Sequence, residues 1–375
     1  MARAPSVPEI EELPEADRLE GFPHPRATPR TFGHEAAERS LAQGFASGRM
    51  HHGWLIAGPE GIGKATLAYR FARFVLAAPS ERDLFGESLG VPEESTAARQ
   101  VRALSHPGLL VIRRGYDTKT KRVPATISVD EVRRLKAFLG RTASEGAWRV
   151  VIVDRADELN ISAANALLKS LEEPPPRTVF LLVSSAPGRL LTTIRSRCRT
   201  LDLAPLDKDA LKRAVTQAIA ASGEAVSAAQ PSPSEWERLE RLCGGSVRRL
   251  LLLHAARGLE LHDRIRALVS GLPRADWSLV HALGDELGSP AAEQRYELFF
   301  ELLMDQLAAL IRARATGTGD ADDQALANRL IEEVATWAGL WERVAADKAD
   351  AAALNLDRKA LILDAFSRLK AVARR

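Results

Sequence analysis

The feature that most constrains the fold is a glycine-rich stretch, residues 58–66, that reads Gly-Pro-Glu-Gly-Ile-Gly-Lys-Ala-Thr. It follows an apolar run at 54–57, which predicts a buried strand, and precedes a segment at 67–76 with apolar residues at helical spacing. Strand, glycine loop and helix in this order are the setting of a phosphate-binding loop, or P-loop. Backbone N–H groups of such a loop surround phosphates, and the helix N-terminus adds partial positive charge. The sequence therefore predicts a nucleotide-binding domain.

The candidate nucleotide-binding residues of this stretch are Gly58, Gly61, Gly63, Lys64 and Thr66. Lys64 is expected to reach the β- and γ-phosphates. The position after this lysine normally carries Ser or Thr, whose hydroxyl holds Mg²⁺, but here it is Ala65. Thr66 cannot simply replace that hydroxyl, because one step along an α-helix rotates a side chain by about 100°. We therefore expect ATP or ADP to be bound without hydrolysis, and no metal site.

A second apolar run, residues 149–153, ends in Asp154. A buried strand that ends in an acid is the Walker B arrangement, in which the acid contacts the Mg²⁺ shell and a following Glu polarises the attacking water. Asp154 is thus a further candidate residue of the nucleotide site. The following residue is Arg155, and a cation cannot take a proton from water. Two separate parts of the hydrolytic machinery are therefore missing together.

Apolar runs predict five strands in all, at 54–57, 109–112, 149–154, 178–183 and 200–203. Helical patterns lie between them, and one of these, residues 162–173, is ended by three prolines. This alternation predicts an α/β domain with a five-stranded parallel sheet and helices on both faces. Ser184 or Ser185, at the tip of the fourth strand, is a candidate sensor of a γ-phosphate.

Beyond about residue 205 only helical patterns occur. We predict a flexible N-terminal tail at 1–20, the nucleotide-binding-like domain at 21–205, a small helical lid domain at 206–270 and an all-α bundle at 271–375. Apolar stripes at 296–311, 337–344 and 354–369 predict the core of that bundle.

Composition excludes several other classes of protein. A net charge of +3 over 375 residues gives no general affinity for nucleic acid. The basic segment 113–122 is read as a solvated loop in preference to a nucleic-acid contact. Two cysteines, Cys198 and Cys243, make neither a disulfide framework nor a cysteine-built zinc site. No apolar run approaches the ~20 residues of a membrane span, and the acidic N-terminus lacks the apolar core of a signal peptide, so we expect a cytoplasmic protein.

Further motifs carry a specific resemblance. Residues 165–175 read Asn-Ala-Leu-Leu-Lys-Ser-Leu-Glu-Glu-Pro-Pro, residues 196–198 read Ser-Arg-Cys, and residues 244–249 read Gly-Gly-Ser-Val-Arg-Arg. Together with the P-loop, in this order, they resemble the bacterial clamp-loader subunits of DNA polymerase III. These are AAA+ proteins that load the ring-shaped sliding clamp onto primed DNA. Because of Ala65 and Arg155, the chain is most similar to the delta-prime branch, and not to the ATP-hydrolysing gamma/tau branch.

The resemblance implies roles for two arginines. Arg197 would be an arginine finger that acts in trans on a neighbouring subunit, and Arg248 would be the family's sensor-2 arginine. It also implies gamma/tau and delta subunits as partners, contact with the sliding clamp and primed DNA through the assembled complex, and a collar formed by the C-terminal bundle. Relatives carry four cysteines of a zinc module, whereas this chain has no cysteine before Cys198. We therefore predict no zinc.

Two alternatives remain open at this stage. In the first, the chain is an active ATP-hydrolysing subunit in which Thr66 and Asp157 or Glu158 take over the missing roles. In the second, it is a nucleotide-sensing regulatory module unrelated to replication, and the clamp-loader motifs are coincidental.

Overall fold

The computed structural model describes residue 15 and residues 17–82, 88–117, 123–140, 147–222, 231–354 and 356–373. The chain forms two compact units, Met1–Gln230 with Glu240–Leu250, and Pro231–Leu239 with Leu251–Arg375. Most of the predicted tail, and residues 118–122 of the predicted basic loop, lie outside the described residues. The division into tail, nucleotide-binding, lid and collar segments stays a prediction.

The first unit is built on one parallel sheet. Its strands are β1 (Gly53–Ala57), β2 (Leu109–Ile112), β3 (Arg149–Val153), β4 (Thr178–Ser184) and β5 (Arg199–Asp202). They lie in the order β2-β3-β4-β1-β5, with every neighbouring pair parallel. The predicted five-stranded parallel sheet is therefore confirmed. Strand β1 lies between β4 and β5, so its end, which begins the P-loop, is flanked on both sides.

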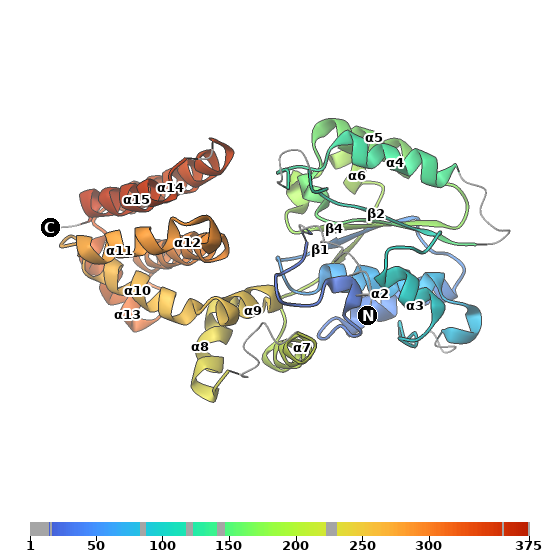
Figure 1. The fold of residues 1–375 in the computed structure, drawn as a ribbon, viewed down its shortest axis with the longest axis horizontal. Coiled ribbons are helices and arrows are strands. Elements are labelled where there is room, and N and C mark those ends of the chain that lie inside the picture. The colour runs from blue at the N-terminus through green and yellow to red at the C-terminus, as the bar shows by residue number, and fades with distance from the viewer. Residues whose placement is uncertain are drawn as a thin grey trace, which may run out of the picture. The chain divides into compact units, whose positions relative to one another are not determined.

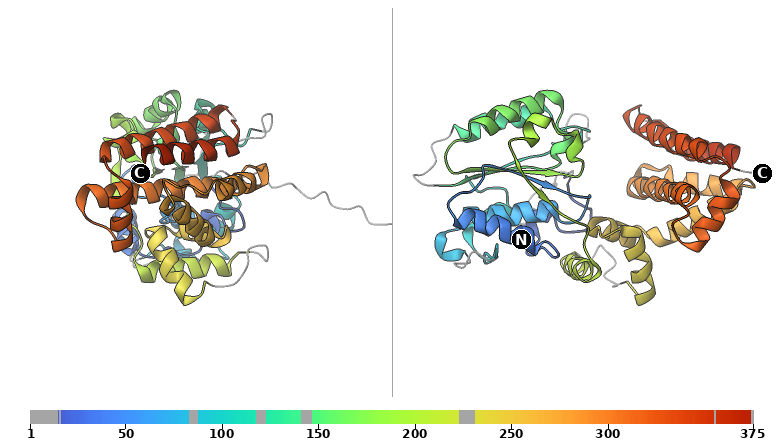
Figure 2. Two further views of the ribbon diagram at one scale, coloured as in Figure 1. Left: turned by 90° about the vertical axis from the view of Figure 1, so that its left-hand side faces the viewer. Right: turned by 180° about the vertical axis from the view of Figure 1, so that it is seen from behind.

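Helices cover both faces of this sheet, as predicted (Figures 1 and 2). One face carries α1 (Glu35–Ala46), α2 (Lys64–Leu76) and α3 (Thr96–Arg102), and the other carries α4 (Val129–Leu139), α5 (Ile161–Glu172) and α6 (Thr192–Arg195). Successive strand side chains point to opposite faces. In β1, Trp54 and Ile56 accordingly join the core under α1 and α2, whereas Leu55 and Ala57 join the core under α4 and α5. Burial on both faces explains the continuous apolar runs of the strands.

Every element that the structure describes after β5 is a helix. The α-helices are α7 (Lys208–Ala220), α8 (Pro233–Cys243), α9 (Val247–Ala255), α10 (Gly258–Ser270), α11 (Trp277–Leu287), α12 (Glu293–Thr316), α13 (Ala321–Leu330), α14 (Val334–Leu354) and α15 (Arg358–Val372). In the second unit, α12 packs against α10, α13 and α14, and α15 packs against α11 and α14. The predicted stripes form the bundle core, with Phe299, Trp337 and Phe366 almost fully buried. Two residues of the predicted stripes depart from this: Trp341 is 36% exposed, and Leu354, at the end of α14, is 69% exposed.

Candidate functional site

The P-loop follows β1 and leads into α2, as predicted. Gly58, Gly61 and Gly63 have positive φ angles of 144°, 78° and 104°. Gly61 lies against the start of α9, because a Cβ atom on it would be 2.2 Å from the Ser246 hydroxyl. The Arg248 backbone N–H also donates to the Gly61 carbonyl, at 3.2 Å. The structure therefore brings Arg248, far along the sequence, to the P-loop.

Lys64 is bound by its own loop. It is 5% exposed, and its ammonium donates to the Gly58 carbonyl at 2.8 Å and to the Pro59 carbonyl at 2.5 Å. A third bond, of 2.9 Å, reaches the Ser185 hydroxyl, whose own backbone N–H donates to the Asp157 carboxylate at 3.0 Å. Burial lowers the pKa of Lys64 to about 8, although nearby carboxylates oppose the shift. A phosphate that binds here must therefore compete with the loop's own carbonyl groups for this ammonium.

Arg155 lies where a catalytic glutamate would stand, and it bridges two carboxylates. Its guanidinium pairs with Glu60 of the P-loop and, at 3.0 Å, with Glu158. The pairs continue outward, because Arg248 Nε lies 3.7 Å from Glu60 and Arg114 Nε lies 2.8 Å from Glu158. Arg155 has a φ of 54°, which is uncommon for a residue other than glycine. This series of ion pairs links the P-loop to the turn after β3. Glu158 takes part in two of the pairs, one with Arg155 and one with Arg114.

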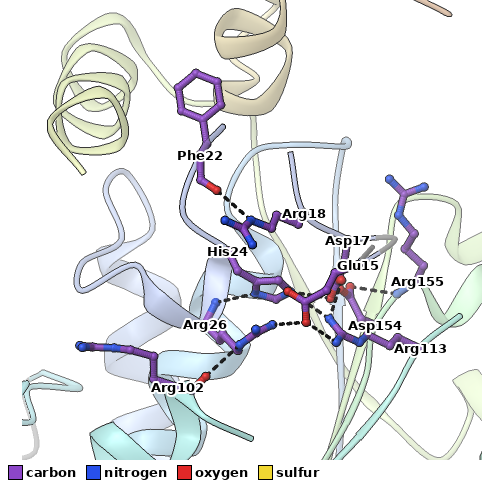
Figure 3. A network of polar contacts seen from close by, with 10 residues as sticks. All are labelled: Glu15, Asp17, Arg18, Phe22, His24, Arg26, Arg102, Arg113, Asp154 and Arg155. Atoms are coloured by element: carbon purple, nitrogen blue, oxygen red, sulfur yellow. Dashed lines mark hydrogen bonds and ion pairs between the residues drawn. The ribbon is translucent and has the colours of Figure 1, made fainter. Parts of the chain in front are cut away.

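Asp154 directly follows Val153, the last residue of β3, one residue beyond the end of the strand and not within it as predicted, and it faces a second carboxyl group. It is 5% exposed, accepts the Arg155 backbone N–H at 3.0 Å and hydrogen-bonds with Asp17 of the N-terminal segment (Figure 3). Burial and the neighbouring Asp17 carboxylate raise the pKa of Asp154 to about 7. Two carboxyl groups this close cannot both ionise easily, so they share one negative charge. Asp154, whose pKa is raised, takes up a proton more readily than Asp17, whose pKa is lowered.

The N-terminal segment is held against this site by ion pairs (Figure 3). Asp17 contacts His24 Nε2 at 2.9 Å and Arg113 at 2.6 Å, and Glu15 contacts Arg113 at 2.5 Å and Arg26 at 2.8 Å. Burial opposes ionisation of Asp17, but the hydrogen bond from His24 and the charge of Arg113 hold its pKa below the ordinary value. Glu15 and Asp17, which fall within the predicted tail, are thus held by buried polar contacts in this structure, while the tail itself stays a prediction.

The residues present do not fit a Mg²⁺ ion. Magnesium requires oxygen ligands in near-octahedral geometry, yet Ala65 offers a methyl group and Asp154 is engaged by Asp17. Thr66 lies one residue further along α2, half-buried. Across the described ranges, no group of three or more His, Cys, Asp or Glu residues is arranged to hold a metal. The absence of zinc stays a prediction.

The carboxyl pair makes stability depend on pH. Asp154 takes up its proton more readily in the folded state than in the unfolded state, where the pKa is near 4, so the free energy of unfolding should fall as pH rises from about 4 to 7. We expect Asp154→Asn to remove this loss and to be about 1–3 kcal/mol more stable than the unmodified chain at pH 8, but not at pH 4. Urea unfolding of both proteins at several pH values measures the difference.

The exposed carboxylate of Asp130 provides the control, since its side chain is 78% exposed. Asp130→Asn should follow the pH profile of the unmodified chain. If Asp154→Asn also shows the same pH dependence of stability as the unmodified chain, the interaction between Asp154 and Asp17 proposed here is contradicted.

Arg197 lies apart from this site. It precedes β5, at the edge where the strands begin, whereas the P-loop follows the end of β1. The Arg197 carbonyl oxygen lies against Gly53, at the start of β1, so Gly58 and the P-loop begin five residues, or roughly 16 Å, further along the sheet at ~3.3 Å per residue. The Arg197 side chain is 37% exposed, pairs with Glu172 at 3.0 Å and donates to the Thr193 carbonyl at 3.0 Å. Arg197 therefore cannot reach the phosphate loop of its own chain.

A parallel sheet in this strand order, with a P-loop after β1 and an acid after β3, defines a P-loop domain of the AAA+ class, here followed by a helical C-terminal region. A family model described as "DNA polymerase III, delta subunit" matches residues 33–207. The delta-prime subunit of DNA polymerase III from Pseudomonas aeruginosa is 34% identical over 281 residues, which cover 72% of this chain and 76% of that protein. The Escherichia coli delta-prime subunit is 33% identical over 71% of this chain and 73% of its own length. The chain belongs to the delta-prime subunit family of DNA polymerase III, a family of clamp-loader subunits.

Two further comparisons are more distant. The tau subunit from Escherichia coli is 28% identical over 89% of this chain and 47% of that protein. A solved gamma-subunit-related protein from Thermotoga maritima aligns over 91% of this chain with 15% identity and a TM-score of 0.39, too low to bear on the site. Within the described part of the chain, no helix is both long enough and apolar enough to cross a bilayer.

Proposed function

We propose that this chain is a non-hydrolysing, stator-like subunit of the DNA polymerase III clamp loader that supplies Arg197 to the nucleotide site of a neighbouring subunit. One observation carries the proposal: the partly exposed Arg197 lies where the strands of the sheet begin, whereas its own P-loop lies where they end. A guanidinium delivered to a γ-phosphate neutralises charge that develops during hydrolysis. At this position it can serve only a nucleotide bound by another chain.

The chain's own site supports a role without hydrolysis. Ala65 cannot hold Mg²⁺, and Arg155 cannot accept a proton from water. The alternative of an active ATPase needs Asp157 or Glu158 as the base. Asp157 accepts the Ser185 N–H and Glu158 is paired with two arginines, which lowers the capacity of either to activate water. Membership of the delta-prime family weighs against the second alternative, a regulatory module unrelated to replication.

The proposed partners are gamma/tau and delta subunits in the cytoplasm, with the sliding clamp and primed DNA met through the assembled complex. ATP or ADP would bind the P-loop glycines, with Lys64 released from the carbonyls of Gly58 and Pro59 to contact phosphate. Arg248, beside Gly61, would contact the same phosphates. Nucleotide bound here would stabilise the domain and would not drive a cycle of ATP hydrolysis.

ATP binding and phosphate release by the purified chain test this proposal. We expect no turnover, whether or not calorimetry detects binding. Ala65→Ser should also give no turnover, because restoring the Mg²⁺ hydroxyl leaves Arg155 at the position of the base. Turnover at ordinary AAA+ rates by the unmodified chain would identify it as a motor subunit and overturn the proposal. Failure to co-purify with gamma/tau and delta subunits would reject the role in clamp loading.

A further inference from the structure

Glu172 is the acidic partner of Arg197. Their side chains are 44% and 37% exposed, and Arg197 Nη2 lies 3.0 Å from Glu172 Oε1. The other terminal nitrogen of Arg197 donates to the Thr193 carbonyl at 3.0 Å. Arg197 Nη1 also donates to the Ser196 hydroxyl, at 3.5 Å. A guanidinium has five N–H donors, so these contacts leave further donors for an incoming anion. The arginine is thus oriented before any neighbouring subunit is present.

The position of Glu172 is unfavourable for its own helix. Glu172 is the last residue of α5, where unpaired backbone carbonyls carry partial negative charge and disfavour a carboxylate. Glu173 follows immediately and adds a second like charge. The ion pair with Arg197 offsets part of this unfavourable interaction at Glu172.

The backbone beside each residue of the ion pair packs against the buried start of β1. A Cβ atom on Gly53, at the start of β1, would lie 3.1 Å from the Arg197 carbonyl oxygen and 3.6 Å from the Leu171 side chain. Leu171, which precedes Glu172, is fully buried. The start of β1 therefore supports the backbone on both sides of the ion pair, and this packing determines the distance between Glu172 and Arg197.

We propose that Glu172 is a positioning residue for Arg197, an inference that rests on the proposed function. The carboxylate holds the guanidinium in one orientation, so that less side-chain freedom is lost when a neighbouring γ-phosphate is contacted. Glu172 itself does not touch the nucleotide, and its effect passes entirely through Arg197.

Clamp-loading rates of the reconstituted complex of this chain with gamma/tau and delta, measured on primed DNA at increasing ATP concentration, test the inference. Loading is the readout because other sites in the complex keep hydrolysing ATP, so kcat is here the maximal loading rate and KM is the ATP concentration that gives half of it. Glu172→Ala should lower kcat three- to tenfold with little change in KM for ATP, and Glu172→Gln, which still accepts a hydrogen bond, should lie between it and the unmodified chain. In an Arg197→Ala background, Glu172→Ala should have no further effect. Glu173→Ala is the matched control, because it removes the neighbouring charge from the same helix end, and it should leave kcat unchanged.

The outcomes separate this inference from the proposed function. An Arg197→Ala variant with unchanged kcat would reject the proposed function itself. If Arg197→Ala lowers kcat but Glu172→Ala does not, or raises it, Glu172 does not position the arginine. A loss from Glu172→Ala that persists in the Arg197→Ala background would show that Glu172 acts through another group, and would also overturn the inference.

Discussion

Replacement of Arg197 by alanine should lower turnover at the nucleotide site of the neighbouring subunit by ~10³-fold or more, because an arginine finger contributes ~10³–10⁵ in rate. Other sites in the complex would keep hydrolysing, so the rate of clamp loading onto primed DNA is the sharper measurement. We expect that rate to fall at least about tenfold. Folding should be intact, since an exposed ion pair such as Arg197–Glu172 contributes only about 0–1 kcal/mol.

Two variants make the result specific to the guanidinium of Arg197. Arg197→Lys keeps the charge but loses the planar fork of donors, and it should recover only part of the activity. Arg195→Ala removes an exposed arginine at the end of α6, two residues before Arg197, and should load clamps normally. Normal ATPase and loading by the Arg197→Ala complex would contradict the proposed role.

Gly58→Ala should cost about 3 kcal/mol or more of the stability of the first unit. Gly58 has a φ of 144°, and a Cβ atom there would lie 2.3 Å from the Leu203 carbonyl oxygen. The Leu203 N–H donates to the Ala57 carbonyl at 2.8 Å, which joins the ends of β5 and β1. The added methyl group would therefore separate two strands at the point where the P-loop begins. Urea unfolding, with hydrogen exchange measured on residues 53–57 and 199–202, reports the loss.

Gly48→Ala is the control for backbone strain alone. Gly48 also has a positive φ, of 68°, but nothing lies within 4 Å of its Cβ position. We expect it to cost only about 1 kcal/mol. Equal losses from the two substitutions would mean that the contact with Leu203 contributes nothing.

Much of the nucleotide site could be predicted from local sequence. The residues of a P-loop are contiguous, so Gly58, Gly61, Gly63 and Lys64 had to lie together once strand and helix were recognised. Arg248 was assigned by resemblance, and packing of the start of α9 against Gly61 brings it to the loop.

The side chains that contact these site residues could not be predicted from the sequence. Asp17 and Asp154 are far apart in the chain, and no spacing or periodicity links them. The same holds for Glu60 and Arg155, and for Glu172 and Arg197. Each pair depends on where the sheet and its loops bring two distant segments together, and charged side chains reveal no pairing until their neighbours are known.

The sequence by itself determined the alternation of strands and helices, because burial on both faces of a sheet demands continuous apolar runs. It also determined which hydrolytic groups are missing, since Ala65 and Arg155 occupy motif positions whose chemistry depends only on residue type. Only the tertiary structure decided that Asp154 lies beside Asp17, that Lys64 is held by its own loop, and that Arg197 lies at the opposite end of the strands from the P-loop. The physical reason is that all strands of a parallel sheet start on one side and end on the other. Only the assembled sheet determines which side chains meet on each of these two sides.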